Sequence, residues 1–177
     1  MIEGTHTTII KREHYQHIRW LGKNVQNANK ILGQVSRTLG KSGEYLAMYD
    51  ITSQGYECFE VSGDLCFDLG MSDNGKIYRV QVKSTSKKRT KNRYQFRVCR
   101  SVRKPTSKNK LNHVEELYKP TDFEILALVI IPLKKVMYIP FCCMMDRKYL
   151  NLTGEEEFSL EDCLKIVKES KEWKWNT

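Results

Sequence analysis

The stretch CFDLGMSDNGKIYRVQVK, residues 66–83, carries the strongest structural signal in this chain of 177 residues. Its Asn74-Gly75 pair is a preferred sequence for a two-residue β-hairpin turn, because both positions of such a turn require positive φ angles. The sequence therefore predicts a strand over residues 65–69 and a returning strand over residues 77–84.

Three polar side chains stand out in this predicted hairpin. Because side chains alternate along a strand, Gln81 and Lys83 point away from the apolar Val80 and Val82. Asp68 lies on the opposite leg of the hairpin. Polar groups along a strand cost stability unless they are solvated, paired or bound to a ligand. We therefore interpret Asp68, Gln81 and Lys83 as functional residues.

Helices are expected on the N-terminal side of the hairpin. Apolar residues recur at helical spacing over residues 8–38. The glycine-rich run at residues 40–43 is expected to interrupt this helix, with Ser42 as the N-cap of a second helix over residues 44–53. Glu44 then shares a helix face with three apolar residues, so its carboxylate lies in line with the side that faces the core.

Strands and one helix are expected after the hairpin. Residues 94–102 are predicted to form a strand and residues 103–112 a polar linker. Residues 122–132 are the most apolar segment and are expected to be central to the sheet, with residues 135–140 as hairpin partner. Residues 159–173 are predicted to close the chain as an amphipathic helix. The fold class is therefore α+β around a mixed sheet.

Positive charge is concentrated in one segment. The formal net charge is +9 at pH 7, and residues 83–110 hold twelve Lys and Arg but no Asp or Glu. Such a segment is typical of a protein that binds a nucleic-acid backbone, and a solvated basic loop is the alternative. Tyr94 and Phe96 within it are expected to be core residues. The nucleic-acid-binding residues predicted from this segment are Lys87, Lys88, Arg89, Lys91, Arg93, Arg97, Arg100 and Arg103.

The cysteines and the apolar segments favour a cytoplasmic protein. Six cysteines occur without Cys-x-x-Cys spacing, so we expect reduced thiols rather than disulfides or a zinc site. The longest apolar run, residues 125–132, is far shorter than the roughly 20 residues of a membrane span. Residues 1–8 lack the pattern of a signal peptide. No contact with a membrane is expected.

These features together resemble the PD-(D/E)XK nuclease superfamily. The matching residues are Gly43-Glu44, Gly55-Tyr56, Gly63-Asp64, Phe67-Asp68-Leu69 and Val80-Gln81-Val82-Lys83. The resemblance covers residues 41–83 and, more loosely, residues 122–140. Glutamine at the third position is similar to the homing endonucleases of that superfamily. The resemblance implies a restriction-endonuclease-like core, in which helices flank a mixed β-sheet.

The resemblance also implies how the chain is divided. Residues 1–40 would form an N-terminal helical extension, and residues 41–177 would form the nuclease core. Within that core, residues 84–112 would be a basic DNA-binding insertion. Its arginine side chains are suited to reading guanine edges in the major groove.

Each site residue receives a role from the resemblance. Phosphodiester hydrolysis needs a metal-activated water and charge stabilisation on the phosphate. Asp68 would be the principal ligand of Mg²⁺, with Mn²⁺ as a substitute, and Gln81 would add a neutral amide oxygen. Glu44 would reach the metal directly or through a water. Lys83 would contact the nucleophilic water and the phosphate.

Two further carboxylates compete for a place in the site. Asp64 lies near the same strand, but its Gly-Asp turn position favours a capping or supporting role over that of Asp68. Asp122 could border the substrate path, although a cap at the start of a strand is the preferred interpretation.

The predicted function is metal-dependent, site-specific cleavage of double-stranded DNA by a homing-type endonuclease. A Holliday-junction resolvase or a restriction enzyme of the same superfamily is the alternative, because both would share the site. A non-catalytic nucleic-acid-binding protein would explain the basic segment but not the carboxylates beside it. Cleavage of both strands needs two sites, so a homodimer or homotetramer is expected.

Overall fold

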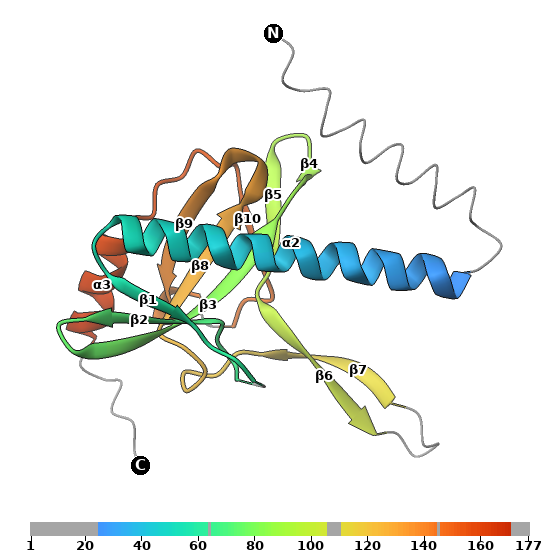
Figure 1. Ribbon diagram of the computed structural model, residues 1–177, viewed down its shortest axis with the longest axis horizontal. Coiled ribbons are helices and arrows are strands. Elements are labelled where there is room, and N and C mark those ends of the chain that lie inside the picture. Colours follow the sequence, from blue (N-terminus) through green and yellow to red (C-terminus); the bar gives the residue numbers. More distant parts are fainter. Residues whose placement is uncertain (1–24, 64, 106–110, 145, 171–177) are drawn as a thin grey trace, which may run out of the picture. The chain divides into compact units, whose positions relative to one another are not determined.

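The computed structural model describes residues 25–63, 65–105, 111–144 and 146–170. The chain divides into two compact units, residues 1–38 and 39–177. The described strands and the C-terminal helix belong to the second unit (Figure 1). Two predictions, the helix before residue 25 and the position of Asp64, lie outside the described residues.

Helix α2, Val25–Ser53, runs without a break through residues 40–43. The predicted interruption there, and the N-cap role of Ser42, are therefore wrong. A glycine in a helix costs roughly 1 kcal/mol relative to alanine, and packing explains why it is tolerated. A Cβ on the buried Gly43 would lie 2.4 Å from the Ser84 Cβ, so the missing side chain lets the helix approach the sheet closely.

The main sheet has five strands in the order β1-β2-β3-β8-β9. These are β1 Glu57–Glu60, β2 Leu69–Asp73, β3 Lys76–Thr85, β8 Ile125–Ile130 and β9 Lys135–Pro140. The predicted hairpin joins β2 and β3, and its turn has φ of 50° at Asn74 and 80° at Gly75. Strands β3 and β8 are parallel and the other pairs antiparallel, which confirms a mixed sheet.

The first leg of the hairpin begins later than predicted. Residues 65–68 are not a strand, and β2 begins only at Leu69. The Asp68 carboxylate accepts a hydrogen bond from the Val82 backbone N–H, at 2.8 Å, where a longer strand would have supplied a carbonyl oxygen. Just before β2 begins, the Asp68 side chain thus takes the place of a backbone carbonyl as the acceptor for Val82.

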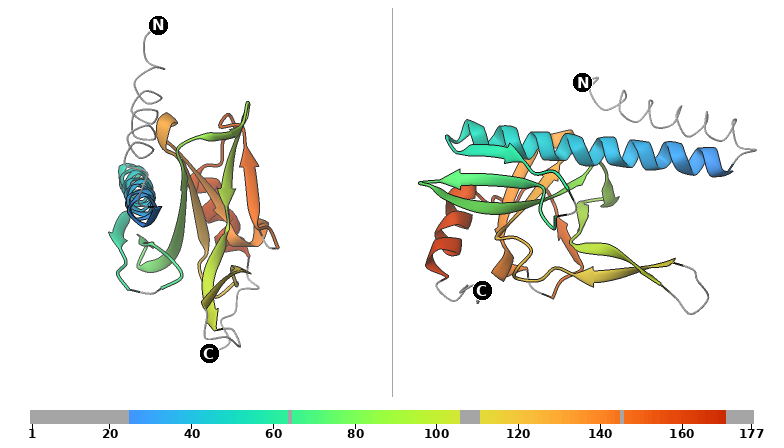
Figure 2. Two further views of the ribbon diagram at one scale, coloured as in Figure 1. Left: turned by 90° about the vertical axis from the view of Figure 1, so that its right-hand side faces the viewer. Right: turned by 60° about the horizontal axis from the view of Figure 1, so that its bottom comes forward.

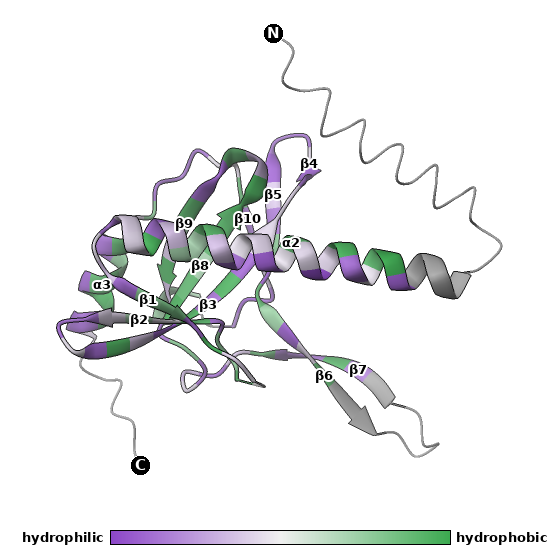
Figure 3. Cartoon of the chain, in the orientation of Figure 1, coloured by the Kyte–Doolittle hydropathy of each residue, from purple (hydrophilic) through white to green (hydrophobic). Residues whose placement is uncertain are grey.

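Both faces of the main sheet are covered. Alternate residues of β8 enter two hydrophobic cores, one shared with α2 and α3 and the other with β5 and β10. Figure 2 shows residues 39–53 of α2 on one side of the sheet and β5 with β10 on the other. All six residues of β8 are buried, and Figure 3 shows this strand hydrophobic along its length. Burial on two faces is why the segment has no polar alternation.

Short elements complete the fold. The C-terminal helix α3, Leu160–Glu169, begins one residue later than predicted, and the predicted residues 171–173 lie outside the described residues. Ser159 is its N-cap, and the Ser159 hydroxyl accepts a hydrogen bond from the Asp162 N–H at 3.0 Å. The 3₁₀ helices η1, Ile131–Leu133, and η2, Phe141–Cys143, flank β9.

A second sheet has the order β10-β5-β4, formed by β4 Lys88–Thr90, β5 Arg93–Arg97 and β10 Tyr149–Leu152. A separate two-stranded ribbon is formed by β6 Cys99–Pro105 and β7 Leu111–Leu117.

Two predictions for the region around this ribbon are wrong. The predicted strand over residues 94–102 is two strands in different sheets, since Val98 ends β5 and its N–H donates to the Lys148 carbonyl at 2.8 Å. The predicted linker over residues 103–112 is strand at both ends, because β6 pairs with β7 from Cys99 to Pro105. Tyr94 and Phe96 are buried in the second core, as expected.

The remaining general expectations concern membranes and thiols. Among the described residues, no helix combines the length and apolar character needed to cross a membrane. The six cysteines are all free thiols in the structure.

Candidate active site

The site forms just before β2 begins, beside β3. The Asp68 backbone N–H still donates to the Val80 carbonyl, at 3.0 Å, as in the antiparallel ladder. Its carboxylate then accepts from the Val82 N–H at 2.8 Å. Two backbone groups of β3 therefore hold Asp68, and its carboxylate lies against the edge of the strand.

Gln81 contacts this carboxylate directly. Its amide nitrogen donates to Asp68 Oδ2 and to the Val82 carbonyl oxygen, the latter at 3.2 Å. Gln81 is only 6% exposed, so the amide is held in a narrow space. Two oxygen atoms, one carboxylate and one carbonyl, thus converge on the same amide.

Lys83 lies two residues after Gln81 on the same face of β3, and its side chain is half-buried. Burial lowers the pKa of its ammonium group, while the negative charge of Asp68 opposes that shift. Its Nζ lies 5.3 Å from the centre of the Tyr118 ring, in cation–π geometry. Lys83 is therefore a cation with little solvent around it, balanced by Asp68 and an aromatic ring.

Asp68 shows the complementary effect. Burial raises the pKa of its carboxyl group, and the Val82 hydrogen bond and the charge of Lys83 only partly oppose this. The nearby charge of Glu44 raises the pKa further. The Asp68 carboxylate is therefore poorly solvated, and a cation bound beside it would favour its charged form.

Glu44 reaches the site from α2. Its carboxylate accepts a hydrogen bond from Lys41 Nζ at 2.8 Å, and the same ammonium group contacts Glu60 of β1. These two hydrogen bonds raise the pKa of Lys41. Lys41 was not predicted, although its position three residues before Glu44 on a helix is a sequence signal for such a pair.

The structure therefore brings the four predicted site residues into one neighbourhood. Asp68 and Gln81 are in direct contact, whereas Glu44 and Lys83 are linked to Asp68 by their charges. Arg79, another polar residue on this face of β3, serves a different purpose. Its guanidinium pairs with Glu124 at 2.7 Å and its backbone N–H donates to the same carboxylate.

Asp122 has a structural role in the turn before β8. Its carboxylate accepts a hydrogen bond from the Lys119 N–H at 2.8 Å, and its own N–H donates to the Lys119 carbonyl at 2.9 Å. These bonds close the turn that leads into β8.

The predicted DNA-binding residues fall into two groups. Five are exposed on or beside the β4–β5 hairpin, where Figure 3 shows hydrophilic residues: Lys87, Lys88, Arg89, Lys91 and Arg93. Arg97 and Arg100 instead form ion pairs with Glu115 and Glu116 of β7, each at 3.2 Å. These acids follow the basic segment in sequence, so only the pairing of β6 with β7 brings them to it. Arg103 lies in β6, but the structure does not describe its side chain.

The oxygen donors of the site suit a hard cation. Asp68, the amide oxygen of Gln81, the Val82 carbonyl and Glu44 are all ligands of the kind that magnesium binds, with waters completing its shell. Within the ranges that the structure describes, no three His, Cys, Asp or Glu side chains form a metal-binding group. A cation here would consequently depend on neutral oxygens and water as much as on carboxylates.

Comparison with known proteins identifies the family. The model of the PD-(D/E)XK endonuclease family matches residues 35–157, which include all four predicted site residues. The chain belongs to this family. No curated protein matches the chain. PD-(D/E)XK membership implies a nuclease, and therefore DNA as its substrate, and nucleases of this family typically use a divalent metal.

A solved structure supports the fold assignment. The structure of a bacterial homing endonuclease, I-Ssp6803I, is similar over 78% of this chain and 97% of that one, with a TM-score of 0.59 and 19% sequence identity. This similarity confirms the expected restriction-endonuclease-like fold of the PD-(D/E)XK chain.

Proposed function

We propose that this PD-(D/E)XK protein is a magnesium-dependent endonuclease that cuts double-stranded DNA at specific sites. The observation that carries the proposal is the half-buried Asp68 carboxylate, held on β3 by Val82 and Gln81 with the Lys83 cation close by. A protein that only bound DNA would gain nothing from a carboxylate whose ionisation is disfavoured.

The chain's own residues divide the work. Asp68, Gln81 and Glu44 would hold Mg²⁺, or Mn²⁺ in its place. Gln81 would turn its amide so that the oxygen faces the ion, a reorientation that the amide's symmetric shape permits. The metal, when bound, lowers the pKa of a coordinated water and stabilises charge on the phosphate.

Lys83 completes the chemistry. With its pKa lowered by burial, the amine can hold the attacking water and exchange a proton with it more readily than an exposed lysine. As an ammonium group it stabilises the additional negative charge that develops on the phosphate oxygens. Both roles require the position beside Asp68 that β3 provides.

The exposed β4–β5 hairpin is proposed to bind the DNA. Its five basic side chains have the exposure needed to reach phosphates or guanine edges. We retain residues 84–112 as the DNA-binding insertion, residues 1–40 as an N-terminal extension and residues 41–177 as the core. Arg103 is proposed to contribute from β6.

Cutting both strands requires two active sites, so we propose a homodimer or homotetramer. The similarity to a homing endonuclease and the glutamine at position 81 favour a homing-type role. A Holliday-junction resolvase or a restriction enzyme would use the same site and remains the second candidate.

The test is cleavage of supercoiled plasmid and of genomic DNA from the source organism, with magnesium. We expect discrete fragments with the wild type, and none with Lys83→Ala or with EDTA. Lys165→Ala, an exposed lysine on α3, is the matched control and should cut normally. Cleavage of four-way junctions but not of duplex would establish the resolvase alternative. Binding without cleavage under any divalent metal would overturn the proposal.

A further inference from the structure

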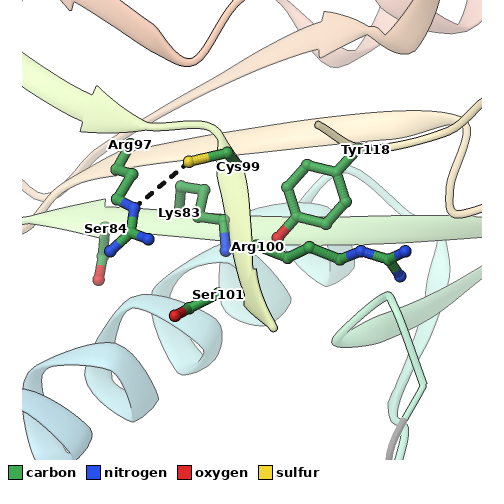
Figure 4. Close-up of a pocket in the computed structure, with 7 residues that line it drawn as sticks. All are labelled: Lys83, Ser84, Arg97, Cys99, Arg100, Ser101 and Tyr118. Carbon is green, nitrogen blue, oxygen red and sulfur yellow. Dashed lines mark hydrogen bonds between the residues drawn. The ribbon is translucent and has the colours of Figure 1, made fainter. Parts of the chain in front are cut away.

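A pocket of about 400 Å³ opens beside Lys83 (Figure 4). Its lining residues provide hydrogen-bond donors and positive charge. The lining residues are Lys83, Ser84, Arg97, Cys99, Arg100, Ser101 and Tyr118. Three of these carry cations and three carry hydroxyl groups, and none of these described residues is acidic. Such a lining suits an anion.

The two arginines of the pocket are held in place by thiols as well as by carboxylates. Arg97 Nε donates to the Cys99 sulfur at 3.3 Å, and its Nη2 pairs with Glu115. Figure 4 shows the guanidinium of Arg97 on the same side of the pocket as Ser84. The Cys99 sulfur helps to orient the guanidinium, and the Glu115 carboxylate partly offsets its charge. Orienting the donors in advance reduces the entropy lost when an anion binds.

Arg100 is arranged in the same way. Its Nη1 donates to the Cys66 sulfur and its Nη2 to Glu116, both at 3.2 Å. Its Nε is buried and, among the described residues, finds no hydrogen-bond acceptor.

Tyr118 orders the pocket around Lys83. Its ring packs edge-to-face on Phe123, with 4.9 Å between centroids, and Phe123 packs likewise on Phe141 at 5.2 Å. The fixed ring places the Tyr118 hydroxyl near Lys83 in Figure 4. None of Glu44, Asp68 and Gln81 lines the pocket. The pocket is therefore next to the proposed metal site and separate from it, with Lys83 shared between them.

We propose that this pocket binds a DNA backbone phosphate adjacent to the phosphate that is cleaved, with Arg97 and Arg100 as its principal ligands. The inference rests on the proposed function and deepens it. A phosphate held here fixes the register of the strand relative to Asp68. The ribbon β6–β7 supplies Arg100 and Ser101, and Tyr118 follows it directly, so the base of the ribbon forms part of the pocket wall. These two arginines thus contact phosphate rather than base edges.

The experiment compares two probes by calorimetry in EDTA at physiological salt: thymidine 3′,5′-bisphosphate, with two neighbouring phosphates, and thymidine 5′-monophosphate. We expect the bisphosphate to bind the wild type at least about tenfold more tightly, as a charge-assisted hydrogen bond implies. Arg97→Ala should reduce this ratio to within about threefold. Arg147→Ala, an exposed arginine outside the pocket, should leave it unchanged. Arg97→Gln keeps a longer polar side chain than alanine and removes the charge, and it replaces the alanine variant if circular dichroism shows that the latter is unfolded.

Equal affinities for the two probes, or a preference that survives in a folded Arg97 variant, would overturn the inference. Because no metal or cleavage is involved, this result is independent of the nuclease test. A failure of plasmid cleavage with intact bisphosphate selectivity would count against the proposed function alone. Normal cleavage without that selectivity would count against the pocket alone.

Discussion

The two faces of strand β3 use one backbone for opposite purposes. Tyr78, Val80 and Val82 are at most 7% exposed and pack into the core with α2 and α3. Gln81 and Lys83 alternate with them and meet Asp68, where burial disfavours the charged form of both ionisable groups. The comparison teaches that apolar packing on one face offsets the cost of holding poorly solvated charges on the other.

The largest effect is expected from the polar face. Asp68→Asn removes the central carboxylate and should lower the plasmid cleavage rate about 1000-fold or more, because the main ionic ligand for the metal is lost. The circular dichroism spectrum should be unchanged. Asp146→Asn is the control, since Asp146 is exposed and its φ of 64° is one that asparagine tolerates. Substantial cleavage by Asp68→Asn would mean that another carboxylate holds the metal.

A substitution on the apolar face should instead lower stability and leave cleavage intact. Val80→Ala leaves the site residues in place but removes two methyl groups from a fully buried position. It should lower the free energy of unfolding by about 2 kcal/mol, measured by urea denaturation, with cleavage retained at temperatures where the protein stays folded. Loss of cleavage without loss of stability would show that the two faces are not separable.

A pair of glycines on α2 tests the close approach of the helix to β3. Gly43→Ala should destabilise the protein by about 1–2 kcal/mol, because the new methyl group would meet Ser84. Gly40→Ala should instead stabilise it by about 0.5–1 kcal/mol, since nothing lies within 4 Å of that position. Equal effects in denaturant titrations would remove packing as the reason for the glycine at position 43.

Gln81→Glu changes the charge of the polar face without changing its shape. A second carboxylate beside Asp68 should lower the magnesium concentration for half-maximal cleavage by roughly tenfold or less, because hard cations prefer charged oxygens. Without metal, the repulsion between the two carboxylates should reduce stability. The measurement is a magnesium titration of cleavage, with thermal unfolding in EDTA beside it. An unchanged magnesium requirement would place Gln81 outside the metal's reach.

The smallest effect concerns stability and pH. The pKa of Asp68 is raised by burial, so the folded state holds this proton more tightly than the unfolded state. The resulting stabilisation is complete below the usual pKa of an aspartate and is lost as the pH rises through the folded value. Asp68→Asn should therefore be more stable than the wild type at pH 7 in EDTA, and this gain in stability should be smaller at pH 4. A gain that is the same at both pH values would exclude the ionisation of Asp68 as its cause.

Much of this was accessible from local sequence. The Asn74-Gly75 turn, the apolar β8 and the Ser159 cap are short-range features, determined by backbone conformation, hydrophobicity and capping within a few residues. The candidate residues Asp68, Gln81 and Lys83 were recognisable because polar groups at strand positions contradict packing unless they have a function. The family match over residues 35–157 confirmed the nuclease that these residues had indicated.

The errors occurred where distant segments decide local structure. Residues 40–43 remain helical because Ser84 packs against the helix, and helix propensity cannot register such a contact. The strand over residues 94–102 divides at Val98 because the partners of its two parts, β10 and β7, lie much later in the chain.

Charge was the property least predictable from the chain. The basic segment contains no acidic residue, yet pairing of β6 with β7 places Glu115 and Glu116 against Arg97 and Arg100. Local sequence thus sufficed for turns, caps and the residues worth testing. Tertiary structure alone decided which cations stay exposed and which line the pocket beside Lys83, because electrostatic energy depends on distance in space and on burial, not on separation along the chain.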